Sequence, residues 1–490
     1  MTNAPHSHTV ERKRLSLGVK FSYAMGGMVD AVVSNSLATF LLFYVTSIAG
    51  LSGGLAGIAL AAGTIVDAVL DPLIGSRSDN QRSRLGRRLP FMLIGLPLVA
   101  AGIFLTFALP RGLSEPLLFA WVLTLSIVLR TALSVFGIPY QAVAAEITED
   151  PGERSTLVGW RWGLGLIGGL AAVLIGFNVF FKGENGLSNA AAYPAFGLTL
   201  AAMLLVAGLF SARAVHRTLD RQHAAPAGGE GGLTVFREVG EVFRNPSFRA
   251  LAGTGLLLLS ALAVNGGLAI HAGTYFWRLS PSQLQLLPLT TLVGLLLGAP
   301  FAAPLTKWLG KRNVALIGLI ALVGAYGVPP TLKVAGLLPL DTNGILILLS
   351  AIGLFVGALM SAAVVATMSM MADATDEHEH IFGTRREGLF FAAWLFASKA
   401  ASGVGIFVAG LILQFVNFPK GASHADVATI DPASLTTFGL LYALIPGALV
   451  LGGVIAMANY RLTANKHAAL LAELHVRRGE RVQVDPPTHP

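Results

Sequence analysis

The chain has 490 residues, of which 54% are hydrophobic and 12% are charged, and its formal net charge at pH 7 is +8. A soluble domain carries about 25% charged residues because it needs a solvated surface, so this composition argues against a soluble enzyme. The sequence contains no cysteine, which excludes disulfides, thiolate chemistry and cysteine-ligated metals.

Apolar runs of about 20 residues recur along the chain, each long enough to cross a hydrocarbon core about 30 Å thick. Helices are expected for such runs, because they satisfy every backbone polar group within the segment. The polar, basic stretch Met1 to Leu15 lacks the apolar core of a cleaved signal peptide, so we expect the first run to be retained. The runs predict an all-α integral membrane protein with twelve transmembrane helices at 17–47, 52–75, 90–109, 116–146, 157–181, 192–212, 249–276, 283–306, 313–334, 344–371, 388–416 and 435–459.

Polar segments divide these helices into two groups of six. The linker between the groups repeats apolar residues with helical spacing at 233–243, which predicts an amphipathic helix on the membrane surface. A basic amphipathic helix is expected near His467–Arg478. We therefore expect an N-terminal tail at 1–16, a six-helix bundle at 17–212, a linker at 213–248, a second bundle at 249–460 and a C-terminal tail at 461–490.

The distribution of lysine and arginine predicts the orientation, because cytoplasmic loops carry an excess of both. If both termini are cytoplasmic, the inside segments hold 25 of the 34 basic residues and the outside loops hold five. We therefore expect a multi-pass protein of the plasma (inner) membrane with both tails and the linker in the cytoplasm. The same distribution accounts for the net charge without a nucleic-acid partner.

Two groups of six helices joined by a long linker are the layout of a secondary transporter built from two halves. A basic loop after the second span, Gly75 to Arg88, has a shorter counterpart after the eighth, Lys307 to Arg312. The sequence has no phosphate-binding Gly-Lys-Ser/Thr loop. We therefore expect a transporter driven by a gradient, with no catalytic residues and no cofactor beside the coupling ion.

Six ionisable residues are candidates for functional charges within the spans. A charge at membrane depth costs a few kcal/mol, and it usually marks a pathway or has a partner. Three of the six are acids and three are bases, as expected for charges that neutralise one another: Asp30, Asp67, Asp71, Arg130, Arg161 and Lys399.

Asp67 and Asp71 are four residues apart, so on a helix they share one face. Two carboxylates at that spacing repel, which raises one pKa or recruits a cation. The pair is therefore a candidate site for a coupling proton or sodium ion, with the hydroxyl of Ser134 as a further ligand. The alternative is a structural ion pair with Arg161 or Lys399.

Asp30 lies in a polar stretch of the first span and is suited to accept hydrogen bonds from sugar hydroxyls. Its alternative role is a salt bridge to Arg130, which itself either holds a substrate carboxylate or neutralises Asp30. Tyr140 and Trp394 are candidate rings for stacking against a sugar, although most such aromatics are packing or interfacial residues.

Several of these residues belong to longer motifs. Asp67 and Asp71 precede Pro72 in the second span, and the run Ser-Arg-Leu-Gly-Arg-Arg follows at 83–88. The run Arg-Arg-Glu-Gly occupies 385–388. In order and spacing, over nearly the whole chain, these motifs resemble the glycoside–pentoside–hexuronide:cation symporter family, a branch of the major facilitator superfamily.

The resemblance implies two six-helix bundles around a central cavity. Carried over position by position, it implies a cation site at Asp67, Asp71 and Ser134, a sugar site at Asp30 and Arg161, and Lys399 between them. We also expect charges of the cytoplasmic loops to latch one transport state: Asp79, Arg84, Arg88, Arg385, Arg386 and Glu387.

The sequence departs from melibiose permease, a member of that family. Gly137 stands at its second sugar-binding aspartate, Val364 at one of its sugar-site tryptophans and Leu70 at an asparagine of its cation site. A galactoside is therefore doubtful as the substrate, and sodium coupling loses one oxygen ligand. Arg130 shares a helix face with Gly137, which favours an acidic sugar such as a uronide.

The sequence thus favours cation-coupled import of a glycoside or an acidic sugar, with proton and sodium both open as coupling ions. One alternative is a carrier for an amphipathic molecule such as a lysolipid or steroid, because animal relatives with the same second-helix pattern carry lipids. Another is a transporter-like sensor that moves nothing. The expected partners are a small-molecule substrate and the lipid bilayer, with no obligate protein partner evident.

Overall fold

The structure, a computed structural model, is helical in every regular element that it describes. Twelve of these helices are long and apolar enough to cross a membrane, which confirms the all-α fold and the twelve spans that the sequence predicts. The described residues are 15–81, 83–148, 150–183, 186–218, 240–384, 386–421 and 430–477.

The first half of the chain forms six of the twelve spans. Local signals set where they begin: Pro151 starts α6, and the Asp150 side chain caps it by accepting from the N–H groups of Gly152 and Glu153 at 2.7 and 3.3 Å. The elements are α1 (Leu17–Ala24), α2 (Gly26–Ser36), η1 (Leu37–Leu41), η2 (Tyr44–Ile48), α3 (Gly53–Asp79), α4 (Leu89–Phe107), α5 (Glu115–Ile147), α6 (Pro151–Ile175), η3 (Gly176–Phe180), η4 (Gly186–Ser188) and α7 (Ala192–Thr218).

The second half supplies the other six spans. Its longest helix, α14, continues past the predicted boundary at 371 to Phe382. Polar residues end the apolar run but do not break the helix, which stops only at Gly383, where φ is +74°. The elements are α9 (Pro246–His271), η5 (Ala272–Phe276), α10 (Pro281–Leu284), α11 (Leu286–Gly298), η6 (Ala299–Phe301), α12 (Ala302–Leu309), α13 (Lys311–Val334), α14 (Thr342–Phe382), α15 (Glu387–Phe415) and α16 (Pro432–Ala458).

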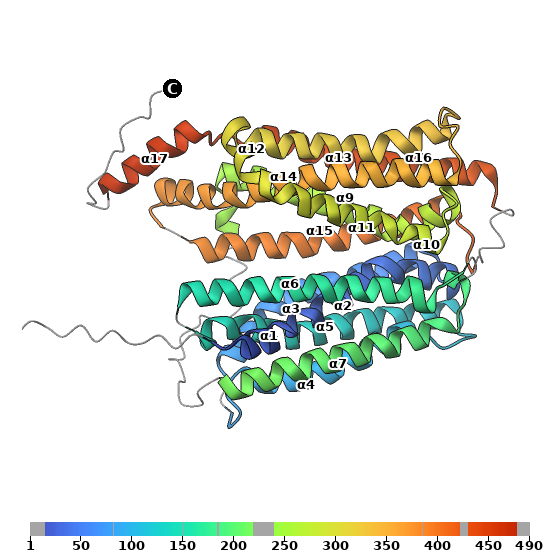
Figure 1. Cartoon of the computed structure of the whole chain (residues 1–490), viewed down its shortest axis with the longest axis horizontal. Coiled ribbons are helices and arrows are strands. Elements are labelled where there is room, and N and C mark those ends of the chain that lie inside the picture. Colours follow the sequence, from blue (N-terminus) through green and yellow to red (C-terminus); the bar gives the residue numbers. More distant parts are fainter. Residues whose placement is uncertain are drawn as a thin grey trace, which may run out of the picture.

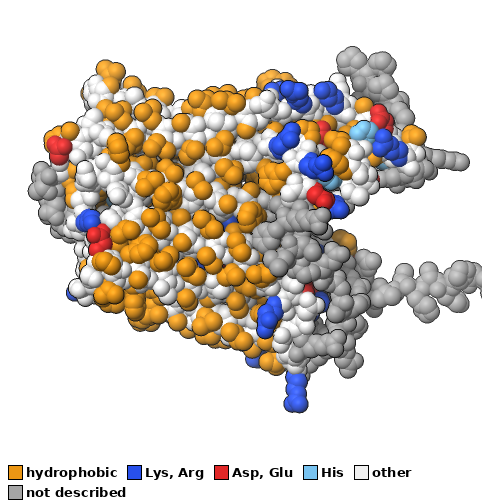
Figure 2. Space-filling model, turned by 180° about the vertical axis from the view of Figure 1, so that it is seen from behind, with side chains coloured by type: hydrophobic (Ala, Val, Ile, Leu, Met, Phe, Trp, Pro, Cys, Tyr) orange, Lys and Arg blue, Asp and Glu red, His pale blue; other side chains and the backbone are white. Residues whose placement is uncertain are grey.

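The two halves lie side by side, with the helices running lengthwise in Figure 1. We call the end at which α3 stops at Asp79 the linker end, and the end at which α4 stops at Phe107 the far end. Large hydrophobic side chains cover the sides of both halves, and lysines and arginines gather at the linker end (Figure 2). Trp308 and Phe415, for example, are 80% and 74% exposed, as suits a lipid-facing surface.

A short helix, α17 (Ala464–Arg477), follows the last span at the linker end, close to the predicted position. Its Leu470 and Leu474 are buried, and Nε2 of His467 lies 3.0 Å from Oδ2 of Asp376 on α14. Helix α17 is thus attached to α14. Most of the expected amphipathic helix at 233–243 lies outside the described residues.

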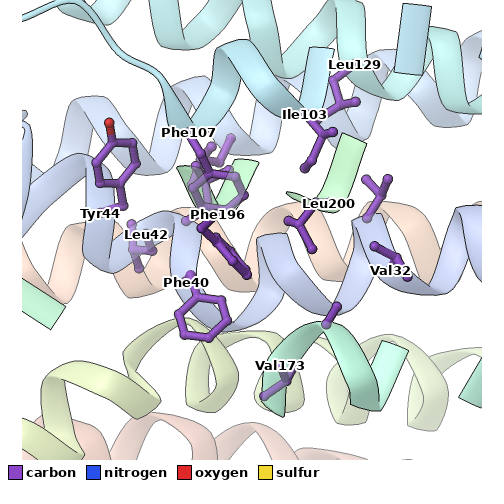
Figure 3. Close-up of a cluster of buried hydrophobic side chains, with 14 of the residues drawn as sticks. Val32, Phe40, Leu42, Tyr44, Ile103, Phe107, Leu129, Val173, Phe196 and Leu200 are labelled. Carbon is purple, nitrogen blue, oxygen red and sulfur yellow. The ribbon is translucent and has the colours of Figure 1, made fainter. Parts of the chain in front are cut away.

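Aromatic packing fixes the helices of the first half relative to one another (Figure 3). The ring of Phe196 on α7 lies 5.3 Å from that of Phe40 on η1 and 5.2 Å from that of Phe107 on α4, both nearly edge to face. All three side chains are fully buried. Edge-to-face pairs stabilise by about 0.5–1.5 kcal/mol beyond the area that they bury, so this cluster holds η1, α4 and α7 as one unit.

The two halves approach most closely toward the far end, where α3 and α15 pack through glycines. A Cβ atom on Gly410 would lie 2.3 Å from the carbonyl oxygen of Gly53 and 2.8 Å from Cα of Gly57. No side chain fits between these backbones. Several side-chain hydrogen bonds join the halves at the same end, among them Asn178 to Gln285 at 2.6 Å, Thr46 with His271 at 3.0 Å and Lys420 to Glu115 at 2.8 Å.

The glycine contact predicts that Gly410→Leu lowers the melting temperature. The leucine forces α3 and α15 apart, and overpacking of this kind costs about 1–3 kcal/mol. Gly403→Ala on the same helix is the control, since its Cβ would meet its nearest atoms at an ordinary 3.5 Å. Thermal melting in detergent tests the contact, and equal melting temperatures for the two variants would show that it does not hold the halves together.

Candidate functional site

Two carboxylates, a hydroxyl and an amine meet near the middle of α3. The Nζ atom of Lys399 on α15 lies 2.7 Å from Oδ2 of Asp67 and 2.5 Å from Oδ2 of Asp71. The Oγ atom of Ser134 on α5 lies 2.6 Å from Oδ1 of Asp71 and also contacts Oδ1 of Asp67. We call these four residues the coupling cluster; they are the residues that the sequence analysis proposes for cation coupling.

The hydrogen bonds of the coupling cluster constrain its protonation. All four carboxylate oxygens have a partner, because Lys399 contacts both Oδ2 atoms and Ser134 contacts both Oδ1 atoms. A hydroxyl donates only one hydrogen bond, so with both aspartates ionised one Oδ1 atom would face a lone pair of Ser134. One added proton removes this conflict, since the acid then donates to Ser134, which donates to the other carboxylate.

The coupling cluster connects the two halves, because α3 and α5 belong to the first and α15 to the second. The side chains of Asp67, Asp71 and Lys399 are 7%, 12% and 25% exposed. At this depth, loss of one partner would leave the others with an uncompensated charge. The position of Lys399 is therefore tied to the charge of the two aspartates.

The remaining three intramembrane charges form a second group, on α2, α5 and α6. Asp30 lies within electrostatic range of Arg130, Arg161 and Lys399, yet no ion pair joins Asp30, Arg130 or Arg161 to any other described residue. Asp30 is exposed, although its helix lies within the bundle. The Asp30–Arg130 salt bridge that the sequence leaves open is thus not formed, and these groups are available to a ligand.

Arg130 lines a cavity of about 390 Å³ enclosed by helices of both halves. Ser34 of α2, one turn along the first span from Asp30, also lines it. Other walls come from η1, α3, α4, α9 and α15. A volume of this size is typical of sites for small molecules.

The two candidate stacking rings lie in packed regions between helices. Tyr140 is 3% exposed, stacks on Tyr23 with ring centroids 5.0 Å apart and donates its hydroxyl to the Tyr23 carbonyl at 3.0 Å. Trp394 is half-buried, with its ring directly against Gly255 of α9. Tyr23 also lies beside Arg161, so Tyr140 packs against a neighbour of that arginine.

The charges predicted as a latch form ion pairs within their own halves. Arg88 pairs with Asp79 and with Glu146 of α5, the latter at 2.8 Å. Arg386 pairs with Glu241 at 3.2 Å. Among the described residues, no ion pair at the linker end crosses between the halves. Arg84 is exposed, Arg385 lies outside the described residues, and the side chain of Glu387 is not described.

Two acids at the linker end join this network without having been singled out from the sequence. Glu146 bridges Arg87 and Arg88, and Glu153 pairs with Lys20 at 2.9 Å. Glu146 ends a predicted span, and Glu153 follows it across a short loop. An acid at a helix end that faces a basic loop is the signal that identifies Glu146, whereas the partner of Glu153 lies on α1.

The cluster predicts that Lys399→Gln destabilises the protein by about 3 kcal/mol, because it leaves two adjacent carboxylates without a cation at membrane depth. Adding Asp71→Asn should restore much of the lost stability. Lys420→Gln is the control, since its pair with Glu115 is solvent-exposed and such pairs contribute about 0–1 kcal/mol. Thermal unfolding of the three variants tests this, and a Lys399→Gln protein as stable as the Lys420→Gln protein would contradict it.

Comparisons with known proteins agree with this architecture. The chain is 26% identical to a putative glycoside/cation symporter, YagG, of Escherichia coli K12, covering 94% of this chain and 95% of the relative. It is 25% identical to the mouse sodium-dependent lysophosphatidylcholine symporter 1, covering 93% and 88%. The fold matches a bacterial homologue of the human lysosomal transporter Spinster with a TM-score of 0.62 at 15% identity, over 96% and 98% of the two chains.

The family model described as MFS/sugar transport protein matches residues 22–464, which is most of the chain and includes the coupling cluster, most of the first span and the other eleven spans. The protein is therefore a membrane transporter and not an enzyme, and it belongs to the MFS/sugar transport protein family of the major facilitator superfamily.

Proposed function

We propose that the protein is a symporter that couples a cation at Asp67 and Asp71 to the import of a hydroxylated organic acid, such as an acidic sugar. The observation that carries the proposal is the pairing of both aspartates with Lys399 from the other half. A cation that binds the aspartates changes their charge and so their attraction to Lys399, which makes ion binding change an interaction between the halves. The named relatives include a putative glycoside/cation symporter.

A proton is the coupling ion that the cluster favours. The single hydrogen of Ser134 cannot serve both Oδ1 atoms, and one extra proton completes the network. The cluster then contains one acid, one carboxylate and one ammonium group, with a formal charge of zero. A sodium ion would need carboxylate oxygens that Lys399 and Ser134 already contact.

Asp30, Arg130 and Arg161 supply the chemistry for the cargo. A carboxylate such as Asp30 accepts hydrogen bonds from hydroxyl groups, and a guanidinium binds a carboxylate through two parallel hydrogen bonds. A hexuronide or related glycoside acid offers both groups. Binding of cargo and cation at neighbouring charges makes the two affinities interdependent, and this coupling is reciprocal.

Transport would proceed by rocking of the two halves about the central sites. The direct contacts between the halves toward the far end support an arrangement that is closed there, while the ion pairs at the linker end stay within each half. The excess of lysine and arginine at the linker end supports a cytoplasmic location for it. This arrangement corresponds to the state that releases cargo into the cell, with the linker-end pairs of Arg88 and Arg386 rearranging when that end closes.

An amphipathic cargo is the second candidate, and two observations favour it. The cavity beside Arg130 is lined mainly by aliphatic side chains. The mouse relative is named as a symporter of lysophosphatidylcholine. Both candidates place an anionic group at Arg130 and share the same coupling cluster.

In proteoliposomes, we expect an inward gradient of one pH unit to raise accumulation of radiolabelled glucuronate about tenfold at a stoichiometry of one proton per cargo. An inward sodium gradient at constant pH should not. Asp71→Asn should abolish the response to pH while leaving exchange of internal for external glucuronate, because the pair then needs no proton.

Asp30→Asn should reduce both accumulation and exchange, and Lys307→Gln, a change at an exposed lysine of α12, should alter neither. Accumulation driven by sodium alone would overturn the proton assignment. Failure of glucuronate to bind at all, in a protein with a normal melting temperature, would overturn the assignment of an acidic sugar.

A further inference from the structure

We infer that the cargo is an amphipathic anion, with its acidic group at Arg130 and an apolar ring body in the cavity beside it. The inference rests on the proposed function for the location of the acidic group. It goes further in proposing that the cavity is an apolar compartment, which binds the hydrophobic part of the cargo.

Aliphatic side chains make up most of the cavity walls. Leu37 and Leu41 of η1, Leu60 of α3, Leu125 of α5 and Leu262 of α9 all line it. Both halves of the protein therefore contribute leucines to the same space. Burial of apolar surface against such walls contributes about 25 cal/mol per Å².

Three of the five side-chain hydroxyl groups on these walls donate to backbone carbonyls. Thr64 donates to the carbonyl of Leu60 at 3.1 Å, Thr106 to Gly102 at 2.8 Å and Ser402 to Ser398 at 3.0 Å. Each of these bonds is to the residue's own helix. A sugar ring placed here would lose hydrogen bonds to water and regain few, which is costly, whereas a hydrocarbon ring would lose none.

Arg130 is the single charged residue among those that line the cavity. It has no ion-pair partner among the described residues. Asp30 lies one helical turn from Ser34 toward the linker end, outside the lining. The polar groups of the cargo thus fit between Asp30 and Arg130, and its apolar body extends from there toward the far end.

Gly266 of α9 gives direct experimental access to the compartment. It lines the cavity, and a Cβ atom built on it would meet nothing within 4 Å. A leucine at this position would occupy the cavity without displacing a neighbour. Replacing a glycine within a helix also favours the helix by up to about 1 kcal/mol, so Gly266→Leu is expected to fold.

Isothermal titration calorimetry on the full chain in nanodiscs tests the inference with three probes: glucuronate, 1-naphthyl β-D-glucuronide and 1-naphthyl β-D-glucoside. We expect the naphthyl glucuronide to bind at least about tenfold more tightly than glucuronate, because its rings are buried in the cavity. Gly266→Leu should remove that difference and leave glucuronate affinity unchanged. Gly324→Leu, an open glycine of α13 outside the lining, should behave like the wild type.

Arg130→Gln should lower the affinity for the naphthyl glucuronide to that for the naphthyl glucoside. Equal affinities for glucuronate and its naphthyl conjugate, unchanged by Gly266→Leu, would overturn the apolar compartment and leave acidic-sugar transport intact. Equally tight binding of the naphthyl glucoside and the glucuronide, both weakened by Gly266→Leu, would establish the compartment. It would overturn the anion site at Arg130 on which the proposed function depends.

Discussion

A charge buried between two helical bundles needs a partner, and Lys399 meets that need by reaching from α15 to Asp67 and Asp71 on α3. The glycine packing of the same two helices toward the far end brings the amine within reach of the carboxylates. The ion pair and the arrangement of the halves therefore depend on each other. Any cation that changes the charge of the aspartates also changes what holds α15 against α3, which is the physical requirement for coupling.

The other intramembrane charges are not neutralised by ion pairs in the way that the coupling cluster is. Asp30 and Arg130 have no ion-pair partner among the described residues, and Asp30 is exposed within the bundle. Charges at membrane depth that face an open space instead of a partner are the ones available to a ligand. The coupling cluster and the proposed cargo site thus differ in how their charges are satisfied, although they lie within electrostatic range of each other.

The twelve spans could be predicted from hydropathy because a membrane demands long apolar helices, and the error at α14 arose because a helix need not end where its apolar run ends. The coupling pair could be proposed from the spacing of Asp67 and Asp71, but the sequence did not identify which cation pairs with it. Lys399 lies 332 residues away from Asp67 in the chain. Arg161 was an equally good candidate until the structure showed that Lys399 lies beside the aspartates. The cavity could not be predicted, because a leucine facing lipid and a leucine facing a cavity look the same in a sequence. Glu146 was missed because its role depends on the loop that folds against it.

The dependence of the halves on the charge of the aspartates can be measured directly by electron–electron distance spectroscopy. The chain contains no cysteine, so spin labels can be attached at Ser155→Cys on α6 and Asn313→Cys on α13, both exposed residues near the linker end. Lowering the pH should shift the distance distribution between the labels, and Asp71→Asn should fix the distribution at its low-pH form. The same pH-dependent shift in both proteins would show that the coupling cluster does not control the arrangement of the halves.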